Sequence, residues 1–349
     1  MPPPFRIGVM QLSMEPLDEM IETARVMDRA GIDTIWLAEA YPWWRKHGME
    51  ARSSTVSSAL IAQATERLTI GWGIISPFTR HPVQAAMDAR VVQEAAGPGR
   101  FLLGFGTSKI FLNNAKLNSR RTLAPMREAV EIVRGVLAGD AFEYDGESFS
   151  ASVPALRDEA EAPRDVPPVY VAATAPKMQM LAGEIGDGLL TPSITTPAFV
   201  RYTRENLAKA GRDPDTIDVG CTILASIGED REAGRDGARE IAGMYLANKF
   251  QNIKGAADTL LELAEIEMEE LRPVAEAMEH GGRLAAKDRV SDNLLDRCKP
   301  IAGTPADCIE AIEEYRDAGC THVMLELWGD RRGEQIELFG SKVLPRFRQ

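Results

Sequence analysis

Amphipathic segments and short apolar runs alternate along the chain. Residues 17–30 place apolar side chains every three or four positions, which predicts a helix. Gly31 ends this helix, and the apolar run 34–38 that follows predicts a buried strand. The same order returns near the other end of the chain, where Gly319 precedes the apolar run 323–327. Repetition of helix, glycine turn and buried strand is typical of a parallel α/β protein.

The number of such runs indicates the fold class. Eight runs are predicted to be strands, centred near Ile7, Ile35, Ile70, Leu102, Val169, Leu190, Ile223 and Met324. Helices are predicted over residues 17–30, 55–65, 81–96, 120–138, 176–184 and 196–210. Eight strands with helices between them favour a single (β/α)8 TIM barrel over residues 1–349 rather than an open doubly wound sheet. The sequence also lacks a GxGxxG motif between a strand and a helix, which counts against an open dinucleotide-binding fold.

Two segments exceed what a barrel needs. Residues 142–165 are rich in Asp, Glu, Ser and Pro and predict an exposed hairpin or loop before the fifth strand. Residues 231–300 are long and mainly helical, and we expect a helical insertion after the seventh strand that could cover the mouth of the barrel. An acidic run inside this segment is more typical of a solvated helix face than of a binding site. It comprises Glu262, Glu265, Glu267, Glu269 and Glu270.

Composition narrows the class of protein and its partners. A hydrophobic content of 44% with 26% charged residues is ordinary for a soluble globular protein, and no apolar run is long enough to span a bilayer. The first residues carry no signal-peptide pattern, so we expect a cytoplasmic protein without a membrane partner. A net charge of −12 argues against nucleic acid as a partner. The four cysteines are widely spaced and form no CxxC pair, which predicts neither a metal site nor disulfides.

Ligands of TIM barrels bind at the carboxyl ends of the strands, so those positions are the candidates for chemistry. Glu39 ends the second strand, where a carboxylate faces the barrel mouth. Three aromatic residues follow it, Tyr41, Trp43 and Trp44. They would either line the pocket of a flat ligand or form an ordinary packed aromatic cluster. After the fifth strand, residues 173–178 place small side chains before a helix that begins at a proline, next to Lys177. This loop is either an anion cradle at a helix N-terminus or a structural turn.

No nucleophile with an adjacent base is recognisable, so we expect a cofactor to supply the chemistry. The third strand opens the segment LTIGWGIISPFTRHP, residues 68–82, and contains Gly71 and Gly73. Glycines weaken a strand, and they indicate a backbone distortion or the close approach of something flat. The alternative is a buried strand with a tight exit. Residues 79–82 are predicted to form the turn that starts the next helix, with His81 structural rather than catalytic.

Three stretches together resemble the luciferase-like monooxygenase superfamily. They are Trp36-Leu37-Ala38-Glu39, residues 64–82 and residues 172–188, in this order and spacing. Their pattern is most similar to the coenzyme F420-dependent branch typified by methylenetetrahydromethanopterin reductase. The resemblance covers residues 5–328. It implies a (β/α)8 barrel that binds a deazaflavin and transfers a hydride between the deazaflavin C5 and an organic substrate.

The resemblance also implies roles for individual residues. The bond Gly73–Ile74 matches a non-prolyl cis peptide that forms a bulge behind the deazaflavin ring in that family. Further positions that match cofactor contacts are Glu39, Ile75 and Ser76 at the ring and ribityl chain, Thr107 and Ser108 at the ribityl and phosphate region, and Ala173, Thr174, Ala175, Pro176, Lys177 and Met178 at the tail.

One departure bears on the substrate. Related sugar-phosphate dehydrogenases carry a glutamate after a Thr-Gly pair at the fourth strand and a histidine after the acidic residue of the second. This chain has Thr107-Ser108-Lys109 and Ala40 at those places, so sugar-phosphate oxidation loses support. Lys109, the second catalytic candidate beside Glu39, would orient an anionic substrate or stabilise developing negative charge, or it is a surface lysine.

Two other functions stay open at this point. One is an FMN-dependent luciferase-like monooxygenase, and the other is a barrel that binds a cofactor without turnover because residues 231–299 fill its mouth. We expect a small-molecule substrate, which the sequence does not identify, and a homodimer of the kind common in the superfamily.

Overall fold

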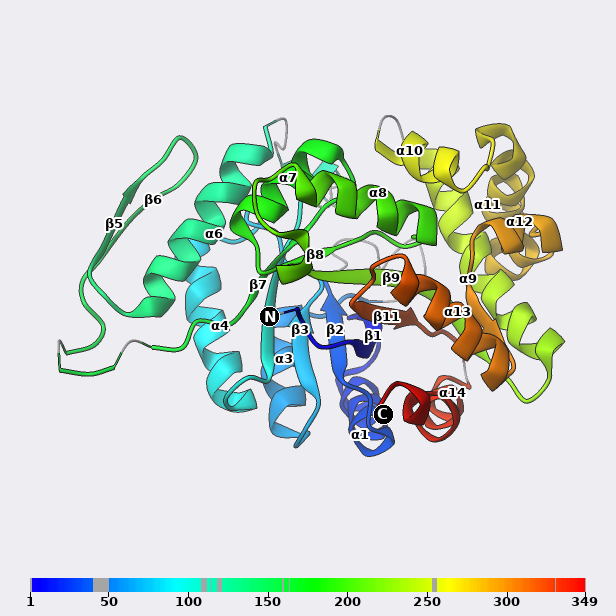
Figure 1. The fold of residues 1–349 in the computed structure, drawn as a ribbon, viewed down its shortest axis with the longest axis horizontal. Helices are drawn as coiled ribbons and strands as arrows, with labels where there is room; N and C mark the ends of the chain where they lie inside the picture. Colours follow the sequence, from blue (N-terminus) through cyan, green and yellow to red (C-terminus); the bar gives the residue numbers. More distant parts are fainter. Residues whose placement is uncertain are drawn as a thin grey trace.

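Eight parallel strands form a closed barrel in the computed structural model, which describes residues 2–39, 50–107, 112–113, 115–117, 121–158, 160–162, 164–252, 256–329 and 331–348 (Figure 1). In order around the barrel they are β1 (Arg6–Leu12), β2 (Thr34–Ala38), β3 (Thr69–Trp72), β4 (Phe101–Phe105), β7 (Val169–Ala172), β8 (Gly188–Leu190), β9 (Asp218–Ile227) and β11 (His322–Glu326). Pairing of β11 with β1, for example Ile7 with Val323, closes the ring. The predicted TIM barrel is confirmed.

Helices cover the outside of the barrel between the strands (Figure 1). They are α1 (Leu17–Ala30), α3 (Ser54–Gln63), α4 (Pro82–Ala96), α6 (Leu123–Ala138), α7 (Pro176–Ile185), α8 (Pro197–Ala208), α13 (Pro305–Asp317) and α14 (Arg332–Leu338). The short helices η1 (Pro214–Thr216), η3 (Phe339–Val343) and η4 (Leu344–Phe347) complete this layer. Gly31 ends α1 with a φ of 80°, a left-handed conformation that glycine adopts without steric cost. None of the helices in the described ranges combines the length and the apolarity needed to cross a membrane.

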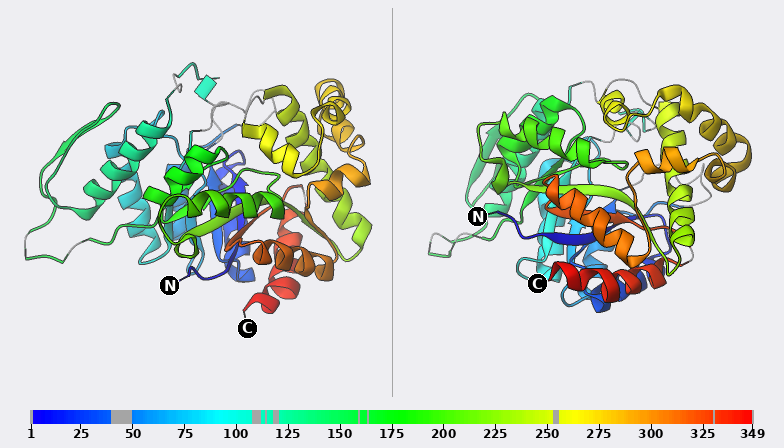
Figure 2. Two further views of the ribbon diagram at one scale, coloured as in Figure 1. Left: turned by 45° about the horizontal axis from the view of Figure 1, so that its top comes forward. Right: turned by 45° about the vertical axis from the view of Figure 1, so that its right-hand side comes forward.

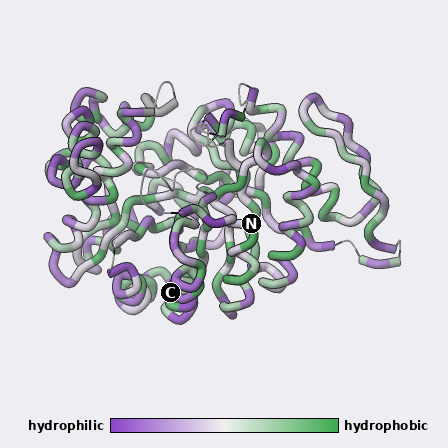
Figure 3. The backbone as a smooth tube through the Cα atoms, turned by 180° about the vertical axis from the view of Figure 1, so that it is seen from behind, coloured by the Kyte–Doolittle hydropathy of each residue, from purple (hydrophilic) through white to green (hydrophobic). Residues whose placement is uncertain are grey.

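Alternate residues of the strands point into the barrel, and their side chains fill it in layers. The middle layer is apolar and consists of Met10, Trp36, Leu102, Tyr170, Leu190 and Met324. Glycine is required beside it at position 71, because a Cβ there would lie 2.4 Å from Cε3 of Trp36. The other face of each strand packs against the helices and forms the main core. Figure 3 shows hydrophobic stretches of the backbone in the interior of the molecule.

The N-terminal end of the barrel is closed by a buried polar network. The Tyr170 hydroxyl donates a hydrogen bond to Asp218 Oδ2 at 2.6 Å, and Thr34 Oγ1 lies 2.7 Å from His322 Nε2. Arg6 Nη1 pairs with the same Asp218 oxygen at 3.1 Å. Burial alone would raise the pKa of Asp218, but His322, Thr321 and Tyr170 outweigh burial and lower the pKa to about 2. His322 Nδ1 lies 3.4 Å from Asp218 Oδ2 and has no hydrogen-bond partner among the described residues. Ligands of TIM barrels bind at the carboxyl ends of the strands, so the site is to be sought at the opposite end.

The predicted exposed hairpin is present. Strands β5 (Phe142–Asp145) and β6 (Ser150–Val153) pair antiparallel and extend away from the barrel at the left of Figures 1 and 2. The buried Glu128 of α6 holds the turn, because its carboxylate accepts hydrogen bonds from the backbone N–H groups of Glu147, Ser148 and Phe149.

The helical insertion after the seventh strand is also present. It consists of α9 (Arg231–Asn252), α10 (Ala256–Leu263), η2 (Met268–Leu271), α11 (Arg272–Lys287) and α12 (Asp292–Arg297), at the upper right of Figure 1. These helices have their own apolar core, which includes Leu246, Leu271 and Leu295. All five glutamates of the acidic run are exposed, as expected for a solvated face. The segment returns through a strand that the sequence did not predict, β10 (Ile301–Gly303), which pairs in parallel with the end of β9.

Candidate functional site

A low apolar floor lies at the carboxyl ends of β2, β3, β4 and β7. Ala38, Ile74 and Ala172 pack on the apolar middle layer of the barrel and remain partly exposed above it. Between them, Gly73 and Ile74 are joined by a cis peptide bond, so this prediction is confirmed. The strand resumes beyond this bond, where Ile75 bridges to Phe105 of β4.

Glycines keep this floor low. A Cβ on Gly106 would lie 2.7 Å from Cγ1 of Ile74 and 3.2 Å from the Cβ of Ala172, and a Cβ on Gly73 would lie 3.0 Å from Cε of Met10. Side chains at these positions would therefore occupy the space above the floor or displace Ile74. The small residues leave a surface on which the flat face of a ring system fits.

Glu39 stands at the edge of this floor. Its backbone N–H donates a hydrogen bond to the Ile74 carbonyl at 3.4 Å, which ties the end of β2 to the cis peptide. Its half-buried carboxylate pairs with Arg80 Nη1 at 3.5 Å, and Arg80 Nε pairs with Asp88 at 3.0 Å. Burial raises the pKa of Glu39, the charge of Arg80 opposes that rise, and Asp88 adds to it. The site therefore contains a carboxyl group that keeps its proton to higher pH than an exposed carboxyl group does.

The exit of the third strand is a turn, as predicted for residues 79–82. The Phe78 N–H donates to Ser76 Oγ at 3.3 Å, and His81 caps α4 by accepting from the Val83 N–H at 3.3 Å. The His81 ring also packs perpendicular to Phe149, with centroids 5.5 Å apart, so its role is structural. The Ile75 side chain is fully buried in the main core, which leaves its backbone at the site.

The loop between β7 and α7 has the features of an anion site. Ala175 occupies the N-cap position of α7 and makes no side-chain cap, so no side chain satisfies the first N–H groups of that helix. Thr174 is half-buried and Lys177 is exposed beside them, whereas Met178 is buried. Pro176 has no N–H, and the Met178 N–H donates to the Ala175 carbonyl at 3.0 Å. The Lys177 N–H, the helix dipole and the Lys177 ammonium group together favour a negatively charged group.

The remaining predicted residues differ in whether the structure describes them. Thr107 follows Gly106 directly and is half-buried at the end of β4. Tyr41, Trp43, Trp44, Ser108 and Lys109 lie outside the described residues.

The sequence reasoning missed a carboxylate on the other side of the mouth. Glu326 is the last residue of β11, is 1% exposed, and accepts a hydrogen bond on Oε1 from the Tyr245 hydroxyl of α9. Burial raises its pKa to about 7, against the lowering effects of Tyr245, Ser193 and Trp328. The rule that selected Glu39, an acidic residue ending a barrel strand, missed Glu326 because this strand was predicted to end one residue later, at Leu327. Arg80 was missed because its role depends on pairing across two strands.

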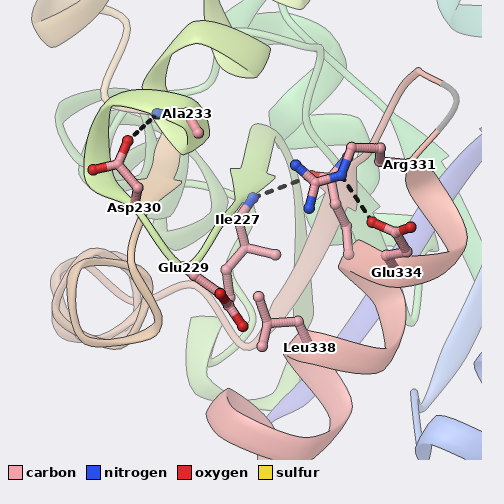
Figure 4. A pocket seen from close by; sticks show the side chains of 8 residues that line it. Ile227, Glu229, Asp230, Ala233, Arg331, Glu334 and Leu338 are labelled. Carbon is pink, nitrogen blue, oxygen red and sulfur yellow. Dashed lines mark hydrogen bonds and ion pairs between the residues drawn. The ribbon is translucent and has the colours of Figure 1, made fainter.

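A separate hollow of about 350 Å³ lies between the end of β9 and α14 (Figure 4). Its polar side chains already pair with local groups: Asp230 accepts from the Ala233 N–H, Arg331 pairs with Glu334, and Gln335 accepts from the Ile227 N–H. The hollow therefore offers less to a ligand than the floor at the barrel mouth.

Comparison with known proteins shows which family and which relatives the chain is similar to. A family model described as luciferase-like monooxygenase matches residues 3–322. The chain is 29% identical to a 5,10-methylenetetrahydromethanopterin reductase of Archaeoglobus fulgidus over 93% of this chain and 94% of that protein. It is 27% identical to an F420-dependent glucose-6-phosphate dehydrogenase of Nakamurella multipartita over 99% of this chain and 98% of that one. The fold is similar to that of the coenzyme F420-dependent tetrahydromethanopterin reductase of Methanopyrus kandleri, with a TM-score of 0.85 and 24% identity over 99% of this chain and 100% of that one.

Proposed function

This chain belongs to the luciferase-like monooxygenase family, and on that premise we propose that it is a coenzyme F420-dependent oxidoreductase. The deazaflavin, when bound, supplies hydride transfer between its C5 and an organic substrate. The names of the relatives support this assignment, since the Nakamurella multipartita dehydrogenase and the Methanopyrus kandleri reductase are both described as F420-dependent.

The observation that carries the proposal is the low floor around Gly73 and Ile74. A flat tricyclic ring needs an apolar surface without projecting side chains, and Ala38, Gly106 and Ala172 provide one beside that peptide. Glu39 would lie at the edge of the ring and hold a proton there, while Arg80 keeps its carboxylate in place. Ile75 and Ser76 would contribute mainly through the backbone, since their side chains are buried.

The cofactor tail would extend toward the start of α7. Its phosphate is an anion, and the start of α7, with the backbone N–H and the ammonium group of Lys177, is suited to it. The residues that would hold the tail are Ala173, Thr174, Ala175, Pro176, Lys177 and Met178. Thr107 and Ser108 would meet the intermediate ribityl and phosphate region, and Lys109 would act on an anionic substrate.

The first test is which cofactor binds. We expect fluorescence titration to show binding of coenzyme F420 with micromolar or tighter affinity and weaker binding of FMN. Ala172→Leu, which raises a side chain above the floor, should weaken F420 binding by about tenfold or more. Gly333→Ala, on α14 where a Cβ meets nothing within 4 Å, is the matched control and should bind F420 like the unchanged protein.

The other outcomes distinguish the alternatives. Tight binding of FMN with no binding of F420 would favour an FMN-dependent monooxygenase. Binding of F420 by Ala172→Leu as tight as by the unchanged chain would place the ring elsewhere than on this floor.

A further inference from the structure

Glu326 occupies an unusual position for a carboxylate. It shares the inward face of β11 with His322 and Met324, so it points into the barrel above the apolar middle layer. Its register partner on β9 is Leu224, which lies in the apolar core of the insertion. A carboxylate in apolar surroundings is costly to keep charged, so its retention there calls for a specific reason.

Its hydrogen bonds are incomplete. Oε1 accepts from the Tyr245 hydroxyl. Ser193 and Trp328 are close enough to lower the pKa of the carboxyl group, but neither reaches hydrogen-bond geometry with the buried Oε2, which has no partner among the described residues. Glu128, a buried carboxylate with a structural role, instead accepts three backbone N–H groups across its two oxygens. Structural carboxylates are satisfied in this way, and an open oxygen at a barrel mouth indicates a group that exchanges a proton or meets a ligand.

The pKa of Glu326 is set by burial and by uncharged neighbours. Burial raises its pKa to about 7, and the groups that lower the pKa are the uncharged Tyr245 of α9, Ser193 after β8 and Trp328 after β11. The next lysine along α9, Lys249, acts on Cys298 of the insertion. The pKa of Tyr245 lies well above its ordinary value because of its burial and of Glu326. Near neutral pH the carboxyl group therefore changes protonation while the tyrosine stays neutral.

Access to Glu326 runs through its partners. Tyr245 and Ser193 are each partly exposed, whereas Glu326 is 1% exposed. Tyr245 belongs to the insertion, and its hydroxyl joins α9 to the buried carboxyl group at the end of β11.

We propose that Glu326 holds the proton that a substrate gains or loses and that the Tyr245 hydroxyl passes this proton between them, an inference that rests on the hydride-transfer function proposed above. Tyr245 is then the catalytic residue that touches the substrate, and Glu326 acts through it. The substrate class that needs such a relay has a polarised double bond, carbon to oxygen or carbon to nitrogen, in its oxidised form.

The atoms and electrons balance as follows in the direction of reduction. The reduced deazaflavin, when bound, would supply a hydride for the new C–H bond at the substrate carbon and a second proton to water, so that the substrate is reduced as the cofactor is oxidised. The π electron pair moves to the oxygen or nitrogen, which takes the proton of Tyr245. Tyr245 regains a proton from Glu326, and water reprotonates the carboxylate. Substrate oxidation runs through the same transfers in reverse.

The first experiment needs no cofactor. Infrared spectra across neutral pH should show a protonated carboxyl band that titrates with a midpoint near 7 and is absent from Glu326→Gln. Tyr245→Phe should keep this band and shift both its frequency and its midpoint, because the hydrogen bond to Oε1 is lost. A Glu326→Gln spectrum that retains the band would overturn the assignment of the proton to Glu326.

The second experiment measures single-turnover hydride transfer against pH in the loaded enzyme. Glu326→Gln and Tyr245→Phe should each slow the transfer by roughly a hundredfold, the scale of general acid–base catalysis, and remove the step near neutral pH. Binding of F420 should be unchanged in both, and Glu326→Asp should restore part of the rate. Glu128→Gln, on α6 at the hairpin, is the matched control and should keep the pH profile.

The results separate this inference from the function on which it rests. Failure of the unchanged protein to bind F420 contradicts the proposed function. F420 binding and turnover with an unaltered pH profile in both Glu326→Gln and Tyr245→Phe contradict the relay alone. Because Tyr245→Phe removes a single oxygen atom, it tests the relay even if Glu326→Gln folds poorly.

Discussion

At the scale of single residues, Asp218 shows how a buried charge stabilises the closed end of the barrel. Its folded-state pKa of about 2 lies below the ordinary aspartate value of 3.8 because hydrogen bonds and charge from His322, Thr321 and Tyr170 outweigh burial. A lowered pKa means that the folded state stabilises the charged carboxylate more than the unfolded state does. Its contribution is present in full above the unfolded pKa and is lost as pH falls through the folded pKa.

We therefore expect Asp218→Asn to lower the free energy of unfolding by on the order of 2 kcal/mol at neutral pH, from a shift of nearly two pKa units. Urea unfolding from neutral pH down to acid should show the difference between the two proteins shrinking between about pH 4 and pH 2. Asp215→Asn, an exposed partner of Arg204, is the control and should change stability little. A difference for Asp218→Asn that stays constant with pH would show that packing, not charge, is lost.

Residues differ in how far the sequence could place them. Glu39 could be selected because a strand-ending carboxylate needs only local pattern to be recognised. Gly73 and Ile74 were placed by the resemblance to a family, and the cis bond is confirmed. Arg80 and Tyr245 could not be placed, because their partners, Glu39 and Glu326, come from distant segments that only the folded chain brings together.

At the scale of elements, α9 is held to the barrel by close approaches at glycines. A Cβ on Gly234 would lie 2.6 Å from the Gly303 carbonyl oxygen of β10, and a Cβ on Gly237 would lie 2.3 Å from Ser226 Oγ of β9. A Cβ on Gly243 would lie 3.1 Å from the backbone of Ala286 in α11. Backbone atoms cannot move aside as a flexible side chain can, so α9 fits its place only with glycine at 234 and 243.

We expect Gly234→Val to destabilise the protein by about 1–3 kcal/mol, because the helix must shift away from β10. Thermal unfolding should show a lower midpoint, and hydrogen exchange should rise in α9 before it rises in the barrel. The helical Gly333→Ala, where a Cβ has open space, should instead be neutral or slightly stabilising. Equal midpoints for Gly234→Val and the unchanged protein would contradict the tight seating of α9.

The elements themselves followed from hydrophobic periodicity wherever it was long enough to read. The helix predicted over residues 17–30 matches α1, and the strand predicted over residues 34–38 matches β2. Strand β10 was missed because three residues, Ile301 to Gly303, carry no readable period. Its strand conformation depends on pairing with β9, which is information from tertiary structure.

At the scale of the whole molecule, neighbouring helices α3 and α4 expose large apolar side chains. Val56 is 63% exposed on α3, Met87 and Val91 are each 57% exposed on α4, and Leu60 adds a further partly exposed site. Apolar groups gathered on adjacent helices are typical of protein–protein interfaces. We propose that this surface, Val56, Leu60, Met87 and Val91, joins two copies of the chain in a homodimer.

Light scattering after size exclusion should then give the mass of a dimer at micromolar concentration. Val56→Asp combined with Met87→Asp should shift the protein to the monomer, because a charge buried at the interface lacks a partner. Leu284→Asp places the same charge at a side chain 66% exposed on α11 and should leave the dimer intact. A monomeric unchanged protein, or a dimer that survives the double substitution, would rule out this surface.

The return of the chain through β10 has a consequence for how such a barrel diversifies. The segment that leaves after Ile227 comes back at Gly303, its register partner, and the Gly228 N–H donates to the Gly303 carbonyl at 3.0 Å. Both ends are thus fastened at one point of the sheet, and lengthening a loop closed at its base adds little entropic cost. We therefore expect that the segment between these two points, which includes Tyr245, can be exchanged for another without disturbing the barrel. The floor on β2, β3, β4 and β7 would stay in place, so the exchange would change the substrate rather than the cofactor.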